Sequence, residues 1–117
     1  MTNIKASEKQ IQSAIIQHLN WHGCWVWRTN AGNIPMYDKR GKKRMIKVGV
    51  RGTPDISGIH KATGKHIGIE IKTPKRKDKV TFAQWEHLKR IKEYNGISGV
   101  ATSPEEALQI IHDQAEI

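Results

Sequence analysis

Apolar residues recur every three or four positions near the amino end, which predicts an amphipathic helix. Ser7 and Gln10 have the spacing of a capping box, so we expect this helix to begin after Ser7. It should run to about Trp21 or His22 and stop at Gly23. The predicted apolar stripe contains Ile4, Ile11, Ile15 and Leu19.

Thr81 and Gln84 repeat the capping-box spacing and predict a second helix. This helix should continue to about Tyr94 and end at Asn95 and Gly96. Its apolar stripe is expected to contain Phe82, Trp85 and Leu88, with Ile91 or Lys92 as the last member.

The last part of the chain predicts a short buried strand at residues 99–102 and a third helix after it. Ser103 fits the N-cap of this helix, Pro104 its first position and Glu106 its third. Residues 113–117 are expected to fray. The packing face should contain Ala107, Leu108, Ile110 and Ile111.

A strand is predicted at Cys24–Thr29, before the centre of the chain. Trp25 and Trp27 should share one face of this strand, while Val26 and Arg28 share the other. The segment that follows, residues 30–33, has the composition of a turn or loop.

Two isoleucine-rich strands, Gly52–Ile59 and Ile67–Lys72, are expected at the centre of the fold. The loop between them ends at Gly64, which can adopt a positive φ. We expect His60 to pair with Lys65, and this pairing fixes the register of the two strands.

In this register Ile56 lies opposite Ile69, and Asp55 lies opposite Glu70 on the other face of the sheet. Lys72 shares the face of the carboxylates. Two carboxylates at this spacing repel each other, so one of them should have a raised pKa unless a cation lies between them. Mg²⁺ is a suitable cation, since it is bound by one or two carboxylates together with water and phosphate oxygens. Lys72 could then orient or activate the attacking water.

The predicted elements follow the order α-β-β-β-α-β-α, with a basic hairpin added after the first strand. This order indicates an α/β fold in which a small mixed β-sheet is flanked by helices. A chain of 117 residues is enough for one core, so we expect a single domain spanning residues 1–117.

Composition adds one strong signal, which is charge. The chain has 20 lysines and arginines against 11 acidic residues, a net charge of +9 that points to a polyanion such as nucleic acid. It has no long apolar run and no signal-peptide pattern, so we expect a cytoplasmic protein without a membrane partner. Cys24 is the only cysteine, which excludes an internal disulfide and a multi-cysteine zinc site.

A family resemblance enters at the central strands. Pro54-Asp55, followed after fourteen residues by Glu70-Ile71-Lys72, resembles the signature of PD-(D/E)xK nucleases. Val50-Arg51-Gly52-Thr53 and the flanking segments are similar to the VRR-NUC family in its small stand-alone phage-type form, over nearly the whole chain.

The resemblance implies a restriction-endonuclease-like core and a DNA endonuclease that uses Mg²⁺ or Mn²⁺ and no small-molecule cofactor. Lys72 and Gln84 would belong to the catalytic residues, with Lys72 positioning water and Gln84 pointing into the site. The implied metal ligands are Asp55, Glu70, the Ile71 carbonyl and Glu8, the last directly or through water.

Glu8 and Gln84 also have purely structural interpretations. Glu8 lies in the first turn of its helix, where the helix dipole stabilises a carboxylate. Gln84 can cap its own helix, so capping and a role in the site would compete for one side chain.

Two basic runs flank the central strands, one in a hairpin formed by residues 35–37 and 44–48 and one on the loop after Pro74. Such runs are often only solvated surface. Phosphate contacts, however, supply most of the non-specific affinity for nucleic acid. The residues expected to contact nucleic acid are Lys39, Arg40, Lys42, Lys43, Arg44, Arg51, Lys75, Arg76 and Lys77. The resemblance implies that Arg28 and Asn30 also contact phosphate, near the active-site cleft.

The sequence therefore predicts a metal-dependent DNA endonuclease. By family analogy it would act as a homodimer on branched DNA such as a Holliday junction, in the host cytoplasm if phage-encoded. Three alternatives stay open: a non-catalytic nucleic-acid-binding module, a nuclease acting on flaps or RNA, and a protein that binds an acidic partner.

Overall fold

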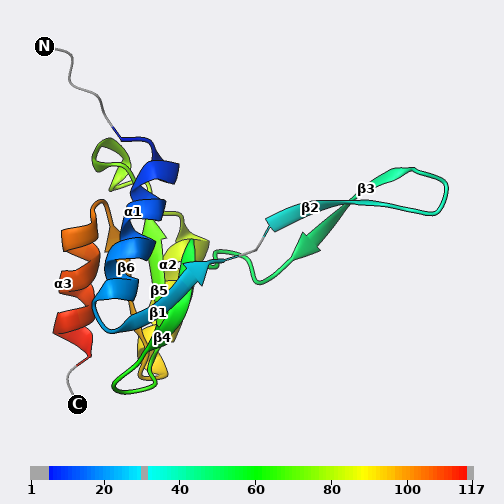
Figure 1. Ribbon diagram of the computed structural model, residues 1–117. Helices are drawn as coiled ribbons and strands as arrows, with labels where there is room; N and C mark the ends of the chain where they lie inside the picture. Colours follow the sequence, from blue (N-terminus) through cyan, green and yellow to red (C-terminus); the bar gives the residue numbers. More distant parts are fainter. Residues whose placement is uncertain (1–5, 30–31, 116–117) are drawn as a thin grey trace, which may run out of the picture.

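The computed structural model describes residues 6–29 and 32–115, and these form a mixed α/β fold with three α-helices (Figure 1). The order of the elements is the predicted one. The helices are α1 (Glu8–Trp21), α2 (Phe82–Glu93) and α3 (Pro104–Gln114), with a short 3₁₀ helix η1 (Pro74–Arg76). The strands are β1 (Cys24–Arg28), β2 (Gly32–Tyr37), β3 (Lys43–Val48), β4 (Ile56–His60), β5 (His66–Ile71) and β6 (Ile97–Ala101).

The main sheet has four strands in the order β1-β4-β5-β6. β1, β4 and β5 are antiparallel neighbours, while β6 runs parallel to β5 because α2 carries the chain back across the sheet. The predicted register is confirmed: Ile56 pairs with Ile69, and the N–H of His60 donates to the Lys65 carbonyl at 2.9 Å. Gly64 closes this hairpin with a φ of +75°.

The core lies on the sheet face that α1 and α3 cover, and α2 packs on the opposite face of β5 and β6. Alternation along β5 sends Ile67, Ile69 and Ile71 into the core, and the intervening residues face α2. Each fully buried isoleucine contributes about 1.5–3 kcal/mol of hydrophobic free energy. From α1 the core receives Ile11, Ile15 and Leu19, as predicted, while Ile4 lies outside the described residues.

All three predicted N-caps are confirmed. Ser7 and Thr81 each form a capping box with the glutamine three residues later, and Ser103 accepts a hydrogen bond from Glu106 N. At the end of α2, Asn95 adopts a φ of +68°. The Gly96 N–H then reaches back to the Ile91 carbonyl at 2.8 Å, which satisfies a carbonyl of the last turn.

Both edge strands of the main sheet bind a side-chain amide in place of a neighbouring strand. Asn20, at the end of α1, donates to the Val26 carbonyl and accepts from the Val26 N–H. Gln114, at the end of α3, makes the same pair of bonds with Ser98. Each amide fastens a helix to an edge of the sheet and occupies ladder groups that another chain could otherwise pair with.

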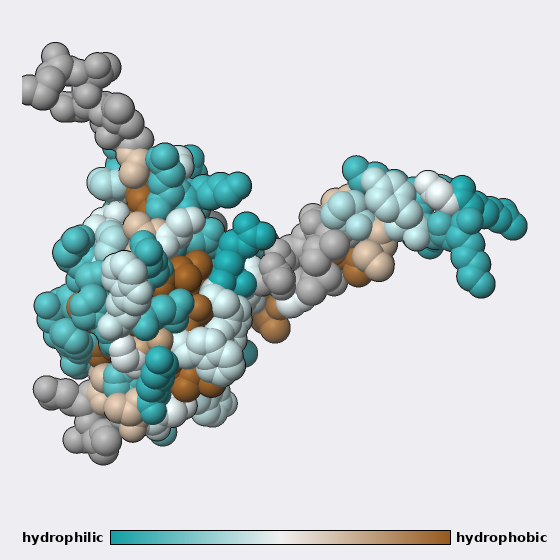
Figure 2. Space-filling model, viewed as in Figure 1, coloured by the Kyte–Doolittle hydropathy of each residue, from teal (hydrophilic) through white to brown (hydrophobic). Residues whose placement is uncertain are grey.

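β2 and β3 form a separate two-stranded sheet that stands away from the body as an arm (Figure 1). At its tip the Asp38 carboxylate accepts hydrogen bonds from the Arg40 and Lys42 N–H groups, and Gly41 has a φ of +78°. Hydrophilic side chains gather at this end of the arm (Figure 2).

Several predicted details are wrong. Phe82 and Trp85 are 80% and 54% exposed, and the buried residues of α2 are Leu88 and Ile91. Gly32 and Asn33 belong to β2 instead of a turn. The expected fraying does not begin at residue 113, because α3 continues to Gln114.

Among residues 6–29 and 32–115, no helix combines the length and the apolar character needed to cross a membrane.

Candidate functional site

Asp55 is held at the start of β4 by its backbone and its side chain. Its carbonyl accepts hydrogen bonds from the Thr29 N–H at 2.8 Å and the Gln12 side chain at 3.4 Å. Its Oδ2 accepts from the Ile71 N–H at 2.8 Å, which reaches across to β5. The carboxylate is therefore fixed beside the end of β5, as the predicted register requires.

Glu70 lies on β5 and is only 3% exposed. One carboxylate oxygen, Oε1, accepts a hydrogen bond from Gln84 Nε2 at 3.0 Å. The other, Oε2, is buried without a hydrogen-bond partner among the described residues. A buried ionised oxygen without a partner is costly, so this site favours either a proton or a cation at Oε2.

The pKa of Glu70 rises from its ordinary value of 4.5 to about 9. Burial is the largest cause, followed by the Asp55 carboxyl group, which can form a hydrogen bond with the protonated form of Glu70 and repels its ionised form. Lys72 lowers this pKa and Glu8 raises it further. The expected pKa rise is thus present, but its main cause is burial and not the repulsion between like charges. Without a cation, Glu70 holds a proton at neutral pH, and this proton can be shared with Asp55.

Lys72 directly follows β5 and is buried. Its backbone N–H donates to the Ala101 carbonyl at 3.2 Å, which extends the pairing of β5 with β6 by one residue. Its charge lowers the pKa of Glu70, so the Lys72 ammonium group lies within electrostatic range of that carboxyl group. Lys72 therefore belongs to the same cluster as the two carboxyl groups.

Gln84 makes both of the contacts that were expected to compete. Its Oε1 accepts from the Thr81 N–H at 2.9 Å and completes the capping box, while its Nε2 donates to Glu70. The expectation of competition is wrong because the amide has an acceptor and a donor at different atoms. The first turn of α2 is thereby fixed to the carboxylate of β5.

Glu8 occupies the first turn of α1, and its side chain is exposed. Its charge acts on Glu70, so Glu8 lies within electrostatic range of that carboxyl group. Across residues 6–29 and 32–115, no three histidine, cysteine or acidic side chains are close enough together to hold a metal ion. A cation would therefore rely on Asp55 and Glu70, and two carboxylates are a usual protein ligand set for Mg²⁺. The orphaned Oε2 of Glu70 fits such an ion.

The loop before Asp55 packs tightly against α2. Gly52 has a φ of +78°, and a Cβ there would overlap the Ala83 carbonyl and lie 2.9 Å from Gln84 N. The Thr53 N–H donates to the Val50 carbonyl at 3.1 Å and closes the turn. Only glycine fits at position 52, so this residue sets the approach of the Asp55 segment to the capped turn that carries Gln84.

The cationic residues fall into separate groups. Arg28 and Arg51 are exposed on the strand and loop that lead toward the site. Lys77 forms a salt bridge of 3.1 Å with Glu106, so it ties its loop to α3. Asn30 lies outside the described residues. The other cations that were predicted to contact nucleic acid are all exposed: Lys39, Arg40, Lys42, Lys43 and Arg44 on the arm and Lys75 and Arg76 on η1.

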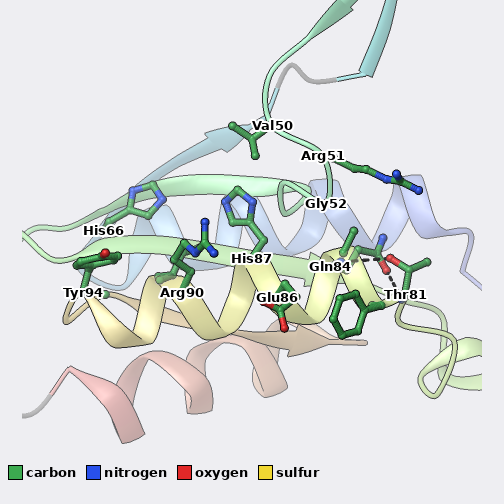
Figure 3. Close-up of a pocket in the computed structure, with 14 residues that line it drawn as sticks. Val50, Arg51, Gly52, His66, Thr81, Gln84, Glu86, His87, Arg90 and Tyr94 are labelled. Carbon is green, nitrogen blue, oxygen red and sulfur yellow. Dashed lines mark hydrogen bonds between the residues drawn. The ribbon is translucent and has the colours of Figure 1, made fainter.

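Two features of the site carried no sequence signal. Gln12 supports the Asp55 carbonyl from α1, although a glutamine on a helix is ordinary in sequence. A groove also extends from Gln84 along α2 toward Tyr94 (Figure 3). Its lining comes from four separate segments, so no local motif could predict it.

Comparison with known proteins adds no family assignment, since no protein-family model and no curated protein matches the chain.

Proposed function

We propose that this protein is a metal-dependent DNA endonuclease with its active site at Asp55 and Glu70. The observation that carries the proposal is the buried Glu70 carboxyl group, with an unpartnered oxygen, beside the half-buried Asp55 carboxylate. The resemblance of Pro54-Asp55 and Glu70-Ile71-Lys72 to PD-(D/E)xK nucleases supports it, as does the α/β arrangement of the elements around them. We also propose that this arrangement is a restriction-endonuclease-like core.

Each residue has a chemical role in this proposal. Asp55, Glu70 and the Ile71 carbonyl would hold the cation, and Glu8 would contribute through water. A bound Mg²⁺ or Mn²⁺ would lower the pKa of a coordinated water and offset charge that develops on the phosphate. Lys72 orients the attacking water, and Gln84 keeps the Glu70 carboxylate in place through its hydrogen bond.

The DNA contacts follow from charge. The arm presents a dense basic tip at a distance from the carboxylates, and η1 presents a second cationic group (Figure 1). Two separated cationic groups suit the two sides of a duplex or two arms of a branch, and by analogy with the nuclease family that the chain resembles we propose branched DNA. Because one chain has one carboxylate pair, cutting two strands requires two copies, and we propose a homodimer.

The test is cleavage of a labelled four-way junction and a linear duplex in Mg²⁺, Mn²⁺ or EDTA. Asp55→Ala removes the proposed ligand. The control is Asp113→Asn, which removes one negative charge at an exposed position of α3. We expect metal-dependent cutting by the wild type and Asp113→Asn only, with the junction preferred. Binding should survive in Asp55→Ala because a charge that repels phosphate has been removed.

A second readout does not need cleavage. A cation that binds only the folded state raises its stability by an amount that grows with cation concentration. Mn²⁺ should raise the thermal midpoint of the wild type and Asp113→Asn and leave that of Asp55→Ala unchanged. Equal shifts in all three proteins, or cutting by Asp55→Ala, would reject the proposed site. Tight binding without any cutting would favour a non-catalytic binding module.

A further inference from the structure

A groove of about 1010 Å³ follows α2 from its capped first turn to its last (Figure 3). Arg51 and Gln84 lie at one end, and Arg90 and Tyr94 lie at the other with His66. Gln84 is the residue that donates to Glu70, so the groove begins beside the carboxylate pair.

The charge of the groove suits a polyanion. Two arginines, Arg51 and Arg90, contribute to its lining, and Glu86 is the one acidic side chain among the described lining residues. His66 and His87 point into it together from β5 and α2. Partial burial and the charge of His87 lower the pKa of His66, which shows that the two rings lie within electrostatic range of each other. A phosphate placed between them would favour their protonated forms.

Two aromatic rings in the groove's lining are solvent-exposed. Phe82 and Tyr94 are both 80% exposed, although α2 buries Leu88 and Ile91 against the sheet. An exposed ring beside cations is a platform on which a nucleic-acid base can stack. A base inside a duplex already stacks on its neighbours, so such a platform selects unpaired bases.

We propose that this groove binds a single-stranded segment of nucleic acid that leads away from the Asp55–Glu70 site. Ten residues separate Gln84 from Tyr94, which at the rise of an α-helix is about 15 Å, enough for a few nucleotides. The inference deepens the proposed function, on which it rests, by naming an unpaired strand at the branch as the part of the substrate held here. Arg51 and Arg90 contact its phosphates, and Tyr94 stacks on a base.

The test measures binding without cleavage, by fluorescence anisotropy of a labelled oligothymidylate in EDTA. Arg90→Gln removes one groove cation, and Lys89→Gln is the matched control, since Lys89 is the exposed neighbour on α2 that does not line the groove. We expect Arg90→Gln to weaken binding about tenfold and to reduce the salt slope by about 0.7, the value for one phosphate contact to a single strand. Lys89→Gln should change the affinity much less.

The stacking contact has its own pair of variants. Tyr94→Ala should weaken binding about tenfold, whereas Tyr94→Phe keeps the ring and should bind like the wild type. Thermal unfolding of each variant confirms that it is folded. Affinity for a blunt duplex should be the same for Tyr94→Ala and Tyr94→Phe. An oligouridylate in the same assay distinguishes RNA from DNA as the source of the strand.

The groove and the nuclease can fail separately. Weaker oligothymidylate binding by Arg90→Gln and Tyr94→Ala, without metal-dependent cutting by any protein, would support the groove and reject the nuclease. Cutting by the wild type combined with equal oligothymidylate binding by Arg90→Gln and Lys89→Gln would reject the groove alone. Failure of the wild type to bind the oligothymidylate would also overturn the inference.

Discussion

The side-chain amide of Gln84 donates a 3.0 Å hydrogen bond from Nε2 to Oε1 of Glu70. The amide oxygen of the same side chain accepts from the Thr81 N–H and completes the cap of α2. The capped end of α2 and the buried carboxylate of β5 are therefore one connected unit. A change at the helix cap alters the position of the carboxylate, and loss of the carboxylate removes a partner of the cap.

The first prediction compares Gln84→Ala with Gln10→Ala. Gln10 makes the equivalent cap on α1, where its Oε1 accepts from the Ser7 N–H at 2.8 Å. Both changes should cost about 0.5–1.5 kcal/mol for the hydrogen bond lost from the capping box. Gln84→Ala should cost about 1–3 kcal/mol more, because it also leaves Oε1 of Glu70 without its donor in a buried place.

Denaturant unfolding of the two variants at neutral pH measures this difference. Equal destabilisation would mean that the bond to Glu70 contributes nothing beyond the cap.

The second prediction concerns the pH dependence of stability without metal. The pKa of Glu70 rises from 4.5 to about 9 on folding, so between these values the folded protein keeps a proton that the unfolded chain releases. Glu70 therefore destabilises the metal-free fold progressively as pH rises through this window, by an amount on the order of 6 kcal/mol at its upper end. Glu70→Gln removes the ionisable group and should flatten this fall.

Denaturant unfolding in EDTA, repeated across the window from pH 4.5 to about 9, follows this effect. Glu93→Gln, in the exposed last turn of α2, is the matched control and should keep the wild-type pH dependence. A wild-type stability that does not fall with pH, or the same fall in Glu70→Gln, would contradict the assignment.

Local patterns were sufficient to predict the order of the elements and the register of β4 and β5. A capping box, the turn at Gly64 and the alternation along an isoleucine-rich strand each involve only a few neighbouring residues. They place Asp55 opposite Glu70 without reference to the rest of the chain. Glu70's burial could not be read in the same way, since it depends on α2 covering that face of the sheet.

The apolar face of α2 shows why periodicity alone was insufficient. At about 100° per residue, the nine residue steps from Phe82 to Ile91 leave a net rotation of about 180°, so the two side chains lie on opposite sides of the helix. A stripe that includes Phe82 and Leu88 drifts around the helix and cannot all face the sheet. The sheet selects Leu88 and Ile91, and Phe82 is left beside the groove.

The third prediction isolates the close approach at Gly52. Gly52→Ala introduces a Cβ into the Ala83 carbonyl and places an alanine at positive φ. Gly64→Ala has the same φ penalty, about 1 kcal/mol, but its Cβ meets nothing within 4 Å. Gly52→Ala should therefore be the more destabilising change, and it should also lower cleavage because it displaces the segment that carries Asp55.

Unfolding free energies and cleavage rates of the two variants are measured side by side. Similar values for both would show that the loop moves away from α2 without consequence for the site.

The fourth prediction separates the arm from the body. β2 and β3 pair with each other in their own sheet, while the core consists of residues from α1, α3 and the main sheet. Replacing the five cations of the arm tip (Lys39, Arg40, Lys42, Lys43 and Arg44) with serine should leave the thermal midpoint almost unchanged, because all five side chains are exposed. Affinity for a DNA duplex should fall, and the slope of log affinity against log salt should decrease by about 0.9 for each phosphate that the protein no longer neutralises.

Serine substitution of three exposed cations outside the arm, Lys9, Lys61 and Lys89, tests whether the arm acts only through net charge. The change in salt slope is divided by the number of charges removed, five in the arm variant and three in the control, before the two are compared. If the arm grips phosphate directly, each of its cations should reduce the salt slope more than each control cation does. The same reduction per charge at both places would show that the body and the arm attract DNA only through the overall charge of +9.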